Sequence, residues 1–282
     1  MKTSSPAFAF WPAIGLKSAG PQPWKAPSAA VTLPLKGFSP RRDRAFHFFA
    51  LTCRMLAMNP LEIVIPGLAL VGLPAWAALH PRAQLFGSTL CRVDDACALT
   101  FDDGPNPRVT PELLSLLEKH HVPATFFVLG KYVKEYPSLA AEIVAAGHGL
   151  GNHTYGHSSL LFFSRRRIVD ELRRCEHAIF SATSRHSSCV RPPFGFRGPQ
   201  FHRAVAEAGF SRVVMWSRAA NDWNPQPASR VRRRIQGLQT GDILLLHDGD
   251  HRLPNADRSY MLQALEYCLP RWQDAGLKFV KV

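Results

Sequence analysis

The sequence lacks the paired cysteines of the common zinc-binding motifs. Its six cysteines stand at positions 53, 91, 97, 175, 189 and 268, and no two of them form a Cys-x-x-Cys pair. We therefore expect no zinc site made of cysteine thiolates. Cys91 and Cys97 are close enough in the chain to form a disulfide in an oxidising compartment, and free buried thiols are the alternative.

Acidic residues are scarce relative to basic ones. The chain holds 21 Asp and Glu against 34 Lys and Arg, which gives a formal net charge of +13. The basic residues are spread along the chain with clusters at 41–44, 165–167 and 230–234, and no zinc-finger, RNP-type or zipper pattern accompanies them. We therefore expect no nucleic-acid partner, and a basic surface that suits anionic envelope polymers or lipid headgroups.

Long apolar runs are also rare, with one exception near the N-terminus. Residues 60–79 carry a single charged residue, Glu62. A membrane-spanning helix needs about 17–25 apolar residues, and prolines such as Pro66 and Pro74 are tolerated in it. We expect residues 46–80 to form a hydrophobic membrane anchor or a signal-like segment, with a soluble packing helix as the third alternative.

The flanks of this apolar segment predict the orientation of the chain. Residues 1–45 are rich in Pro, Ser, Ala and basic residues without a helical or strand period, which is typical of a disordered extension. Four arginines between positions 41 and 54 precede the segment, and two follow it before position 93. The positive-inside bias then places the N-terminus in the cytoplasm and the domain at 90–282 outside it, in a bacterial cell envelope or periplasm.

From residue 94 onward, short apolar runs alternate with helical patterns. One of the helices is expected from Gly130 to about Ala146. Repeated strand–helix units predict parallel strands covered by helices, in a closed or nearly closed (β/α) barrel of about seven strands, or else in a doubly wound sheet. The expected strands are 98–101, 123–129, a short strand that ends at Asn152, 188–191, 212–216, 242–247 and 277–282.

Ionisable residues follow several of these strands where each one ends. Asp102 and Asp103 end the first strand, although a solvated Asp-Asp-Gly turn is the alternative there. Active sites of (β/α) barrels collect at the C-terminal ends of the strands, so we expect these residues to meet. Further polar stretches follow later strands at 152–157, 191–195, 221–223 and 247–248.

Two histidines four residues apart follow the third strand. One turn of helix, or an equally compact turn, places His153 and His157 on one side. Two histidines and one carboxylate are the ligand set of a catalytic zinc that keeps positions open for water and substrate. The remaining histidines outside these stretches, His251 among them, are interpreted as surface or structural residues.

The order and spacing of five stretches resemble the polysaccharide deacetylases, the NodB-homology family. They are TFDDG at 100–104, HTYGH at 153–157, RPPF at 191–194, DW at 222–223 and LLH at 245–247. The segment ATFFVLG at 124–130 also fits, and the resemblance covers about residues 94–282. It implies a metal-dependent amidohydrolase on a distorted (β/α) barrel that removes acetyl groups from N-acetylated sugars.

The resemblance also implies a role for each residue at the centre of the site. Asp103, His153 and His157 are expected to hold one divalent metal ion, with zinc as the first choice. Asp102 is expected to be the general base that takes a proton from the attacking water. Arg191 is expected to brace Asp102 by a charge-assisted hydrogen bond.

A second group of roles surrounds this centre. By the resemblance, His247 protonates the departing amine, and Asp222 holds that histidine. The backbone N–H of Phe194 is expected to stabilise the oxyanion. Trp223 and Leu245 are expected to wall the substrate groove and the pocket for the acetyl methyl group, with ordinary core positions as the alternative for both.

The sequence departs from the family pattern at two positions. Ala219 stands where an acid is often found four residues before the tryptophan, and Phe194 stands where tyrosine is common. The expected activity is N-deacetylation of N-acetylglucosamine-containing glycans. A lipid-linked amino-sugar deacylase, an O-acetyl esterase and a non-catalytic glycan-binding module on the same fold are the alternatives.

Overall fold

The computed structural model describes residues 72–187 and 189–282. The extension predicted at 1–45 and most of the segment predicted at 46–80 lie outside these residues. Residues 72–79, at the end of the predicted membrane segment, form a short helix. Within the described ranges, no helix has the length and apolar character needed to cross a membrane.

A parallel sheet forms the centre of the described fold, as the strand–helix alternation predicts. Its strand order is β3-β2-β1-β5-β4, and every pair of neighbours runs parallel. The register places Asp102 of β1 level with Phe127 of β2 and His247 of β5. The strands are β1 (Ala98–Asp102), β2 (Ala124–Val128), β3 (Gly149–Asn152), β4 (Arg218–Ala219) and β5 (Ile243–His247).

The number of strands differs from the expectation: the described part of the chain has five in its sheet, not about seven. The expected strands at 188–191, 212–216 and 277–282 are reduced to isolated bridges at Val190, Val213, Val214 and Phe279. Two prolines follow Arg191 and cannot extend a ladder, because proline has no N–H to donate. The bridges still connect β3 through 190 and 213 to the chain that enters β4, as in a distorted barrel.

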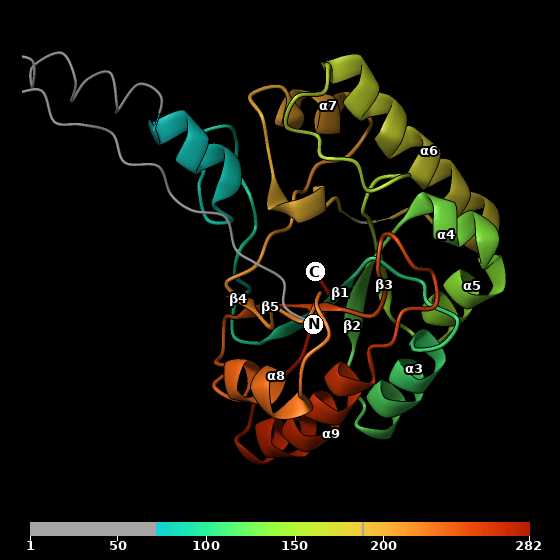
Figure 1. Ribbon diagram of the computed structural model, residues 1–282, viewed down its shortest axis with the longest axis vertical. Helices are drawn as coiled ribbons and strands as arrows, with labels where there is room; N and C mark the ends of the chain where they lie inside the picture. Colours follow the sequence, from blue (N-terminus) through green and yellow to red (C-terminus); the bar gives the residue numbers. More distant parts are fainter. Residues whose placement is uncertain (1–71, 188) are drawn as a thin grey trace, which may run out of the picture. The chain divides into compact units, whose positions relative to one another are not determined.

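Helices surround the strands (Figure 1). The helix expected from Gly130 to about Ala146 is divided at Tyr136, whose backbone (φ −126°, ψ 62°) is not helical, because the residue before a proline disfavours the helical region. The helices are α3 (Thr110–Lys119), α4 (Gly130–Glu135), α5 (Pro137–Ala145), α6 (Arg165–Thr183), α7 (Phe201–Glu207), α8 (Ala228–Ile235) and α9 (Ser259–Asp274), with a 3₁₀ turn at Pro193–Gly195.

Alternation along β1 explains how one strand serves both the core and the site. Every residue of β1 is buried. Leu99 and Phe101 belong to the large apolar cluster shared with the helices, whereas Ala98 belongs to a small cluster with Phe127 and Ile243. Because successive side chains point to opposite faces, Thr100 and Asp102 share the face of Ala98. The strand thus delivers Asp102 to the inside of the barrel.

The predicted disulfide between Cys91 and Cys97 is absent from the described residues. Both side chains are free thiols, so the alternative of unpaired cysteines holds for them. Burial raises the pKa of the Cys97 thiol to about 11. Buried thiols of this kind act as small apolar side chains.

Candidate metal and catalytic site

The adjacent carboxylates Asp102 and Asp103 lie at the end of β1 with different backbone conformations. Asp102 is the last residue of the strand, and Asp103 follows it with a φ of 70°. Both side chains are buried. A left-handed conformation in a residue other than glycine carries strain and is concentrated at functional sites. The reversal turns Asp103 away from the strand direction and toward the loop after β3.

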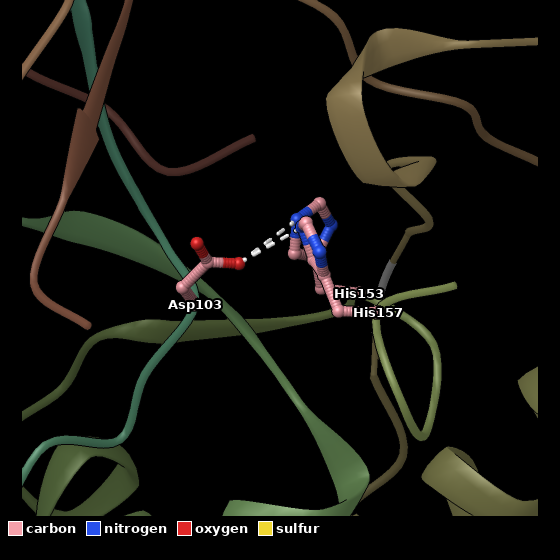
Figure 2. A group of neighbouring side chains, drawn as sticks. All are labelled: Asp103, His153 and His157. Atoms are coloured by element: carbon pink, nitrogen blue, oxygen red, sulfur yellow. Dashed lines mark ion pairs between the residues drawn. The ribbon is translucent and has the colours of Figure 1, made fainter. Parts of the chain in front are cut away.

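Asp103, His153 and His157 converge on one point (Figure 2). One ligand atom from each of the three lies within 4.8 Å of the others. Asp103 Oδ1 is 3.1 Å from His157 Nε2 and 3.6 Å from His153 Nε2. Yet this buried oxygen forms no hydrogen bond in the described residues. A buried oxygen facing two ring nitrogens without hydrogen bonds is the arrangement that a metal ion satisfies.

The protonation states of Asp103 and His157 also favour metal binding. Burial by itself raises the pKa of Asp103, but the histidines around the carboxylate outweigh it and hold that pKa below its ordinary range. Burial lowers the pKa of His157 to about 3, so its imidazole is neutral at neutral pH. An ionised carboxylate and neutral imidazoles are the forms that ligate metals. The donor set therefore fits a divalent ion in both type and charge.

The turn after β3 aims the two histidines. His153 donates from Nδ1 to the carbonyl of Arg191 at 2.7 Å, which leaves Nε2 to face Asp103. Thr154 and His157 have φ values of 69° and 60°, so the spacing of the pair comes from a compact turn and not from a helix. A hydrogen bond on the remote nitrogen fixes the tautomer and orientation of a metal-ligating histidine.

Arg191 reaches Asp102 as the sequence predicts. Its guanidinium is fully buried and donates from Nη1 to Asp102 Oδ1 at 2.7 Å and to Thr100 Oγ1 at 2.9 Å. Its other nitrogens bond the carbonyls of Val214 and Met215. Ala219, the position without an acid, lies on β4. The arginine is therefore held by the backbone carbonyls of Val214 and Met215, and one oxygen of Asp102 is fixed.

His247 and Asp222 form a second buried pair. His247 donates from Nδ1 to Asp222 Oδ1 at 2.9 Å, and the backbone N–H of His247 donates to Asp222 Oδ2 at 3.0 Å. Burial favours the neutral imidazole, but the Asp222 carboxylate, with smaller contributions from Asp103 and Asp102, raises the pKa of His247 to about 9. The structure therefore keeps this histidine protonated at neutral pH.

The three predicted substrate-binding residues take different positions. A cavity of about 310 Å³ is lined by the metal and catalytic side chains together with Phe194 and Trp223, each of which is about half exposed. Leu245 is buried in β5 and does not line the cavity. By the alternation of the strand it shares a face with His247, beneath the site.

The expectation from the sequence that His251 is a surface or structural residue is wrong, because His251 lies in the site. It lines the cavity, and its ring stacks on that of His157 with the centroids 4.2 Å apart. Its Nδ1 lies 3.7 Å from Asp103 Oδ2, the oxygen that faces away from the two metal-site histidines. The sequence does hold a signal for this position, because His251 follows His247 and Asp248 in the loop after a strand that ends in the site.

Arg258, at the start of α9, is a second site residue that the sequence motifs do not indicate. Its buried guanidinium donates to the carbonyls of Gly249, Asp222 and Trp223 and pairs with Asp250 at 3.1 Å. It thus ties the loop after β4 to the loop after β5. No motif marks this arginine, because its partners lie up to 36 residues away.

The loop after β5 packs directly on the loop after β1. The N–H of Gly249 donates to the carbonyl of Asp102 at 3.3 Å. A Cβ atom at Gly249 would lie 2.1 Å from the carbonyl oxygen of Asp103, and one at Gly104 would lie 2.4 Å from the carboxylate of Asp248. Neither glycine leaves room for a side chain, so the contact requires both.

Comparison with known proteins identifies the family. A family model described as polysaccharide deacetylase matches residues 90–213. The chitooligosaccharide deacetylase of Sinorhizobium fredii is 39% identical over 188 residues, which cover 63% of this chain and 86% of that protein. The peptidoglycan-N-acetylglucosamine deacetylase of Bacillus cereus is 34% identical over 187 residues, covering 66% of this chain and 85% of that protein.

A solved structure agrees with this match. The family 4 carbohydrate esterase from Streptomyces lividans, in complex with acetate, superposes with a TM-score of 0.59 at 28% identity, covering 66% of this chain and 91% of that one. Each of the five stretches that carry the resemblance in the sequence contributes at least one residue to the lining of the cavity described above. The chain belongs to the polysaccharide deacetylase family.

Proposed function

We propose that this chain is a metal-dependent hydrolase that removes N-acetyl groups from N-acetylglucosamine-containing polysaccharide or oligosaccharide and releases acetate. The convergence of Asp103, His153 and His157 around an unsatisfied buried oxygen carries the proposal. The names of the two relatives support the substrate class, since one acts on chitooligosaccharide and the other on peptidoglycan N-acetylglucosamine.

The buried triad would hold the metal, with zinc as the proposed ion. Zinc prefers imidazole and carboxylate ligands in this number when a catalytic site keeps positions open. When bound, such an ion supplies Lewis acidity and lowers the pKa of water at the site. The proton transfers and the stabilisation of the oxyanion are assigned to side-chain and backbone groups of this chain.

Asp102 is the proposed general base. Arg191 holds its Oδ1, and its Oδ2 faces the site 3.7 Å from His153 Nε2. A carboxylate with one oxygen fixed and the other aimed at the cavity can accept a proton from the attacking water. Positioned general bases contribute about 10²–10⁴-fold to rate.

His247 is the proposed general acid. The departing amine nitrogen must gain a proton as the C–N bond breaks, and His247 is protonated at neutral pH because of Asp222. Its side chain lines the same cavity as Asp102. The backbone N–H of Phe194, in the turn at Pro193–Gly195, is the proposed donor to the oxyanion.

Acetate release from a panel of glycans tests the proposal. N-acetylglucosamine oligomers, peptidoglycan fragments, O-acetylated xylan and a lipid-linked N-acetyl sugar are each incubated with the protein, with and without a chelator. We expect acetate from the first two and inhibition by the chelator. Release only from the O-acetylated or the lipid-linked substrate would move the activity to that class, and release from none would leave a glycan-binding module.

A further inference from the structure

A buried arginine outside the five family stretches has no acidic partner among residues 72–187 and 189–282. Arg197, two residues after the turn that carries Phe194, is 1% exposed. Among the described residues, no ion pair with a carboxylate is formed by this guanidinium, and burial lowers its pKa. Burying a charge without a counter-charge is costly unless hydrogen bonds replace the lost water. The hydrogen bonds of Arg197 must therefore compensate for its burial, and their partners indicate its role.

Arg197 hydrogen-bonds to the segment that follows the short helix at 72–79. Its Nη2 donates to the carbonyls of His80 and Ala83, each at 2.9 Å, and its backbone N–H donates to the carbonyl of Ala78 at 2.9 Å. The alanines of this segment are buried. Residues 77–83 are thus docked on the domain through the side chain and the backbone N–H of Arg197, with a further hydrogen bond from Arg82 Nη2 to the carbonyl of Ser217 at 2.8 Å. They precede residue 90, where the family match begins.

The same guanidinium also holds the turn over the site. Arg197 Nη1 donates to the carbonyl of Gly195 at 3.0 Å. Gly195 has a φ of 72°, and a Cβ there would lie 2.6 Å from the ring of Trp216. Its neighbour Phe194 has a φ of 59°. The ring of Phe194 packs edge-on against that of His157, with the ring centroids 4.6 Å apart. The left-handed conformation is unstrained in Gly195 but strained in Phe194, so the conformation of Phe194 has to be maintained by its surroundings.

We infer that residues 77–83 are part of the catalytic unit and that Arg197 is a positioning residue that couples this segment to the Phe194–Gly195 turn. The inference rests on the proposed function for the role of that turn. Arg197 touches neither the metal triad nor the proposed acid and base. Its removal should therefore loosen both segments and misplace the oxyanion donor, without emptying the metal site or removing substrate contacts.

The test compares full-length Arg197→Met and Arg197→Lys with wild type and with Arg203→Met, a matched change of an exposed arginine on α7. Four quantities are measured: hydrogen–deuterium exchange of peptides spanning 76–88 and 190–198, zinc affinity, and kcat and KM for acetate release from an N-acetylglucosamine oligomer. For Arg197→Met we expect faster exchange in both peptides, with kcat about tenfold to a hundredfold lower. KM and zinc affinity should be unchanged.

The lysine variant should rescue part of kcat, because it keeps the charge but cannot bridge both segments as a guanidinium does. Arg203→Met should match wild type throughout. Unchanged exchange in Arg197→Met, or faster exchange with an unchanged kcat, would overturn the inference. A wild-type protein that releases no acetate would defeat the proposed function instead, and the exchange data alone would then decide whether residues 77–83 are docked through Arg197.

A second variant covers the case in which Arg197→Met does not fold. Gly87 has a φ of 143°, and a Cβ there would lie 2.3 Å from the ring of His202 on α7. Gly87→Ala therefore loosens the segment from its other end while Arg197 stays intact. The same pattern of faster exchange at 76–88 and lower kcat supports the coupling, and loosening without any loss of kcat contradicts it.

Discussion

At the scale of single residues, the adjacent carboxylates Asp102 and Asp103 have different contacts and therefore different proposed roles. Asp102 keeps the strand conformation and is held by Arg191. Asp103 adopts a positive φ and faces two imidazoles. The sequence predicted both residues and their division of labour through the family resemblance. Their distinct backbone conformations depend on the turn and on the glycine of the facing loop, which no local pattern shows.

Replacing Asp102 with asparagine tests the proposed base. Asp102→Asn keeps the size of the side chain and the bond from Arg191 but loses basicity, so kcat should fall by about 10²–10⁴-fold while zinc stoichiometry stays at the wild-type value. Acetate release and metal analysis measure the two quantities. Asp103→Asn is the matched control, in which zinc affinity itself should fall. Near-normal turnover in Asp102→Asn would show that the base is another group.

The proposed acid predicts the alkaline side of the pH profile. His247 donates a proton only below its pKa of about 9. The activity should therefore be present at neutral pH and be lost as the pH rises through about 9. Asp222→Asn removes the charge that raises this pKa, so the loss should move to lower pH, toward the ordinary value of 6.5. An alkaline limb that Asp222→Asn leaves in place would argue against His247 as the acid.

At the scale of elements, the strands that carry the site were predictable and the connecting ones were not. The apolar runs that became β1, β2 and β5 are buried on both faces, as their composition indicates. The runs near 190, 213 and 279 are also apolar but make only isolated bridges. Ladder length depends on the neighbouring backbone, including Pro192 and Pro193, and not on hydrophobicity alone.

The contact between the loops after β1 and β5 makes its own prediction. Gly249→Ala places a methyl group against the carbonyl of Asp103, and overpacking of this kind costs about 1–3 kcal/mol. Denaturant unfolding should show that loss in the free energy of unfolding, together with reduced acetate release. Gly237→Ala is the control, because its Cβ would meet an atom no closer than 3.9 Å. Equal stability of the two variants would contradict the account of the loop contact.

At the scale of the whole molecule, the residues missed by the sequence analysis share one property. His251, Arg258 and Arg197 act across loops that are distant in sequence, and their partners are largely backbone carbonyls or ring faces. Motif spacing reveals residues that a reaction requires by type. It does not reveal side chains whose role arises only when two loops meet.

The membrane location stays a prediction from the sequence. If the part of the predicted segment at 46–80 that precedes the docked residues 77–83 anchors the chain with its domain outside the cytoplasm, the full-length protein should sediment with membranes after cell lysis and resist extraction by high salt. Protease added to intact spheroplasts should digest the domain. A chain recovered in the salt wash, or one protected in spheroplasts, would rule out an outward-facing anchored enzyme.

The central claim is that Asp103, His153 and His157 hold a metal ion on which deacetylation depends. Chelator-stripped protein should release no acetate from an N-acetylglucosamine oligomer, and one equivalent of Zn²⁺ should restore the release. His153→Ala, which breaks the triad, should fail to bind that equivalent and should stay inactive. Full acetate release by the stripped protein, or by His153→Ala, would contradict the account.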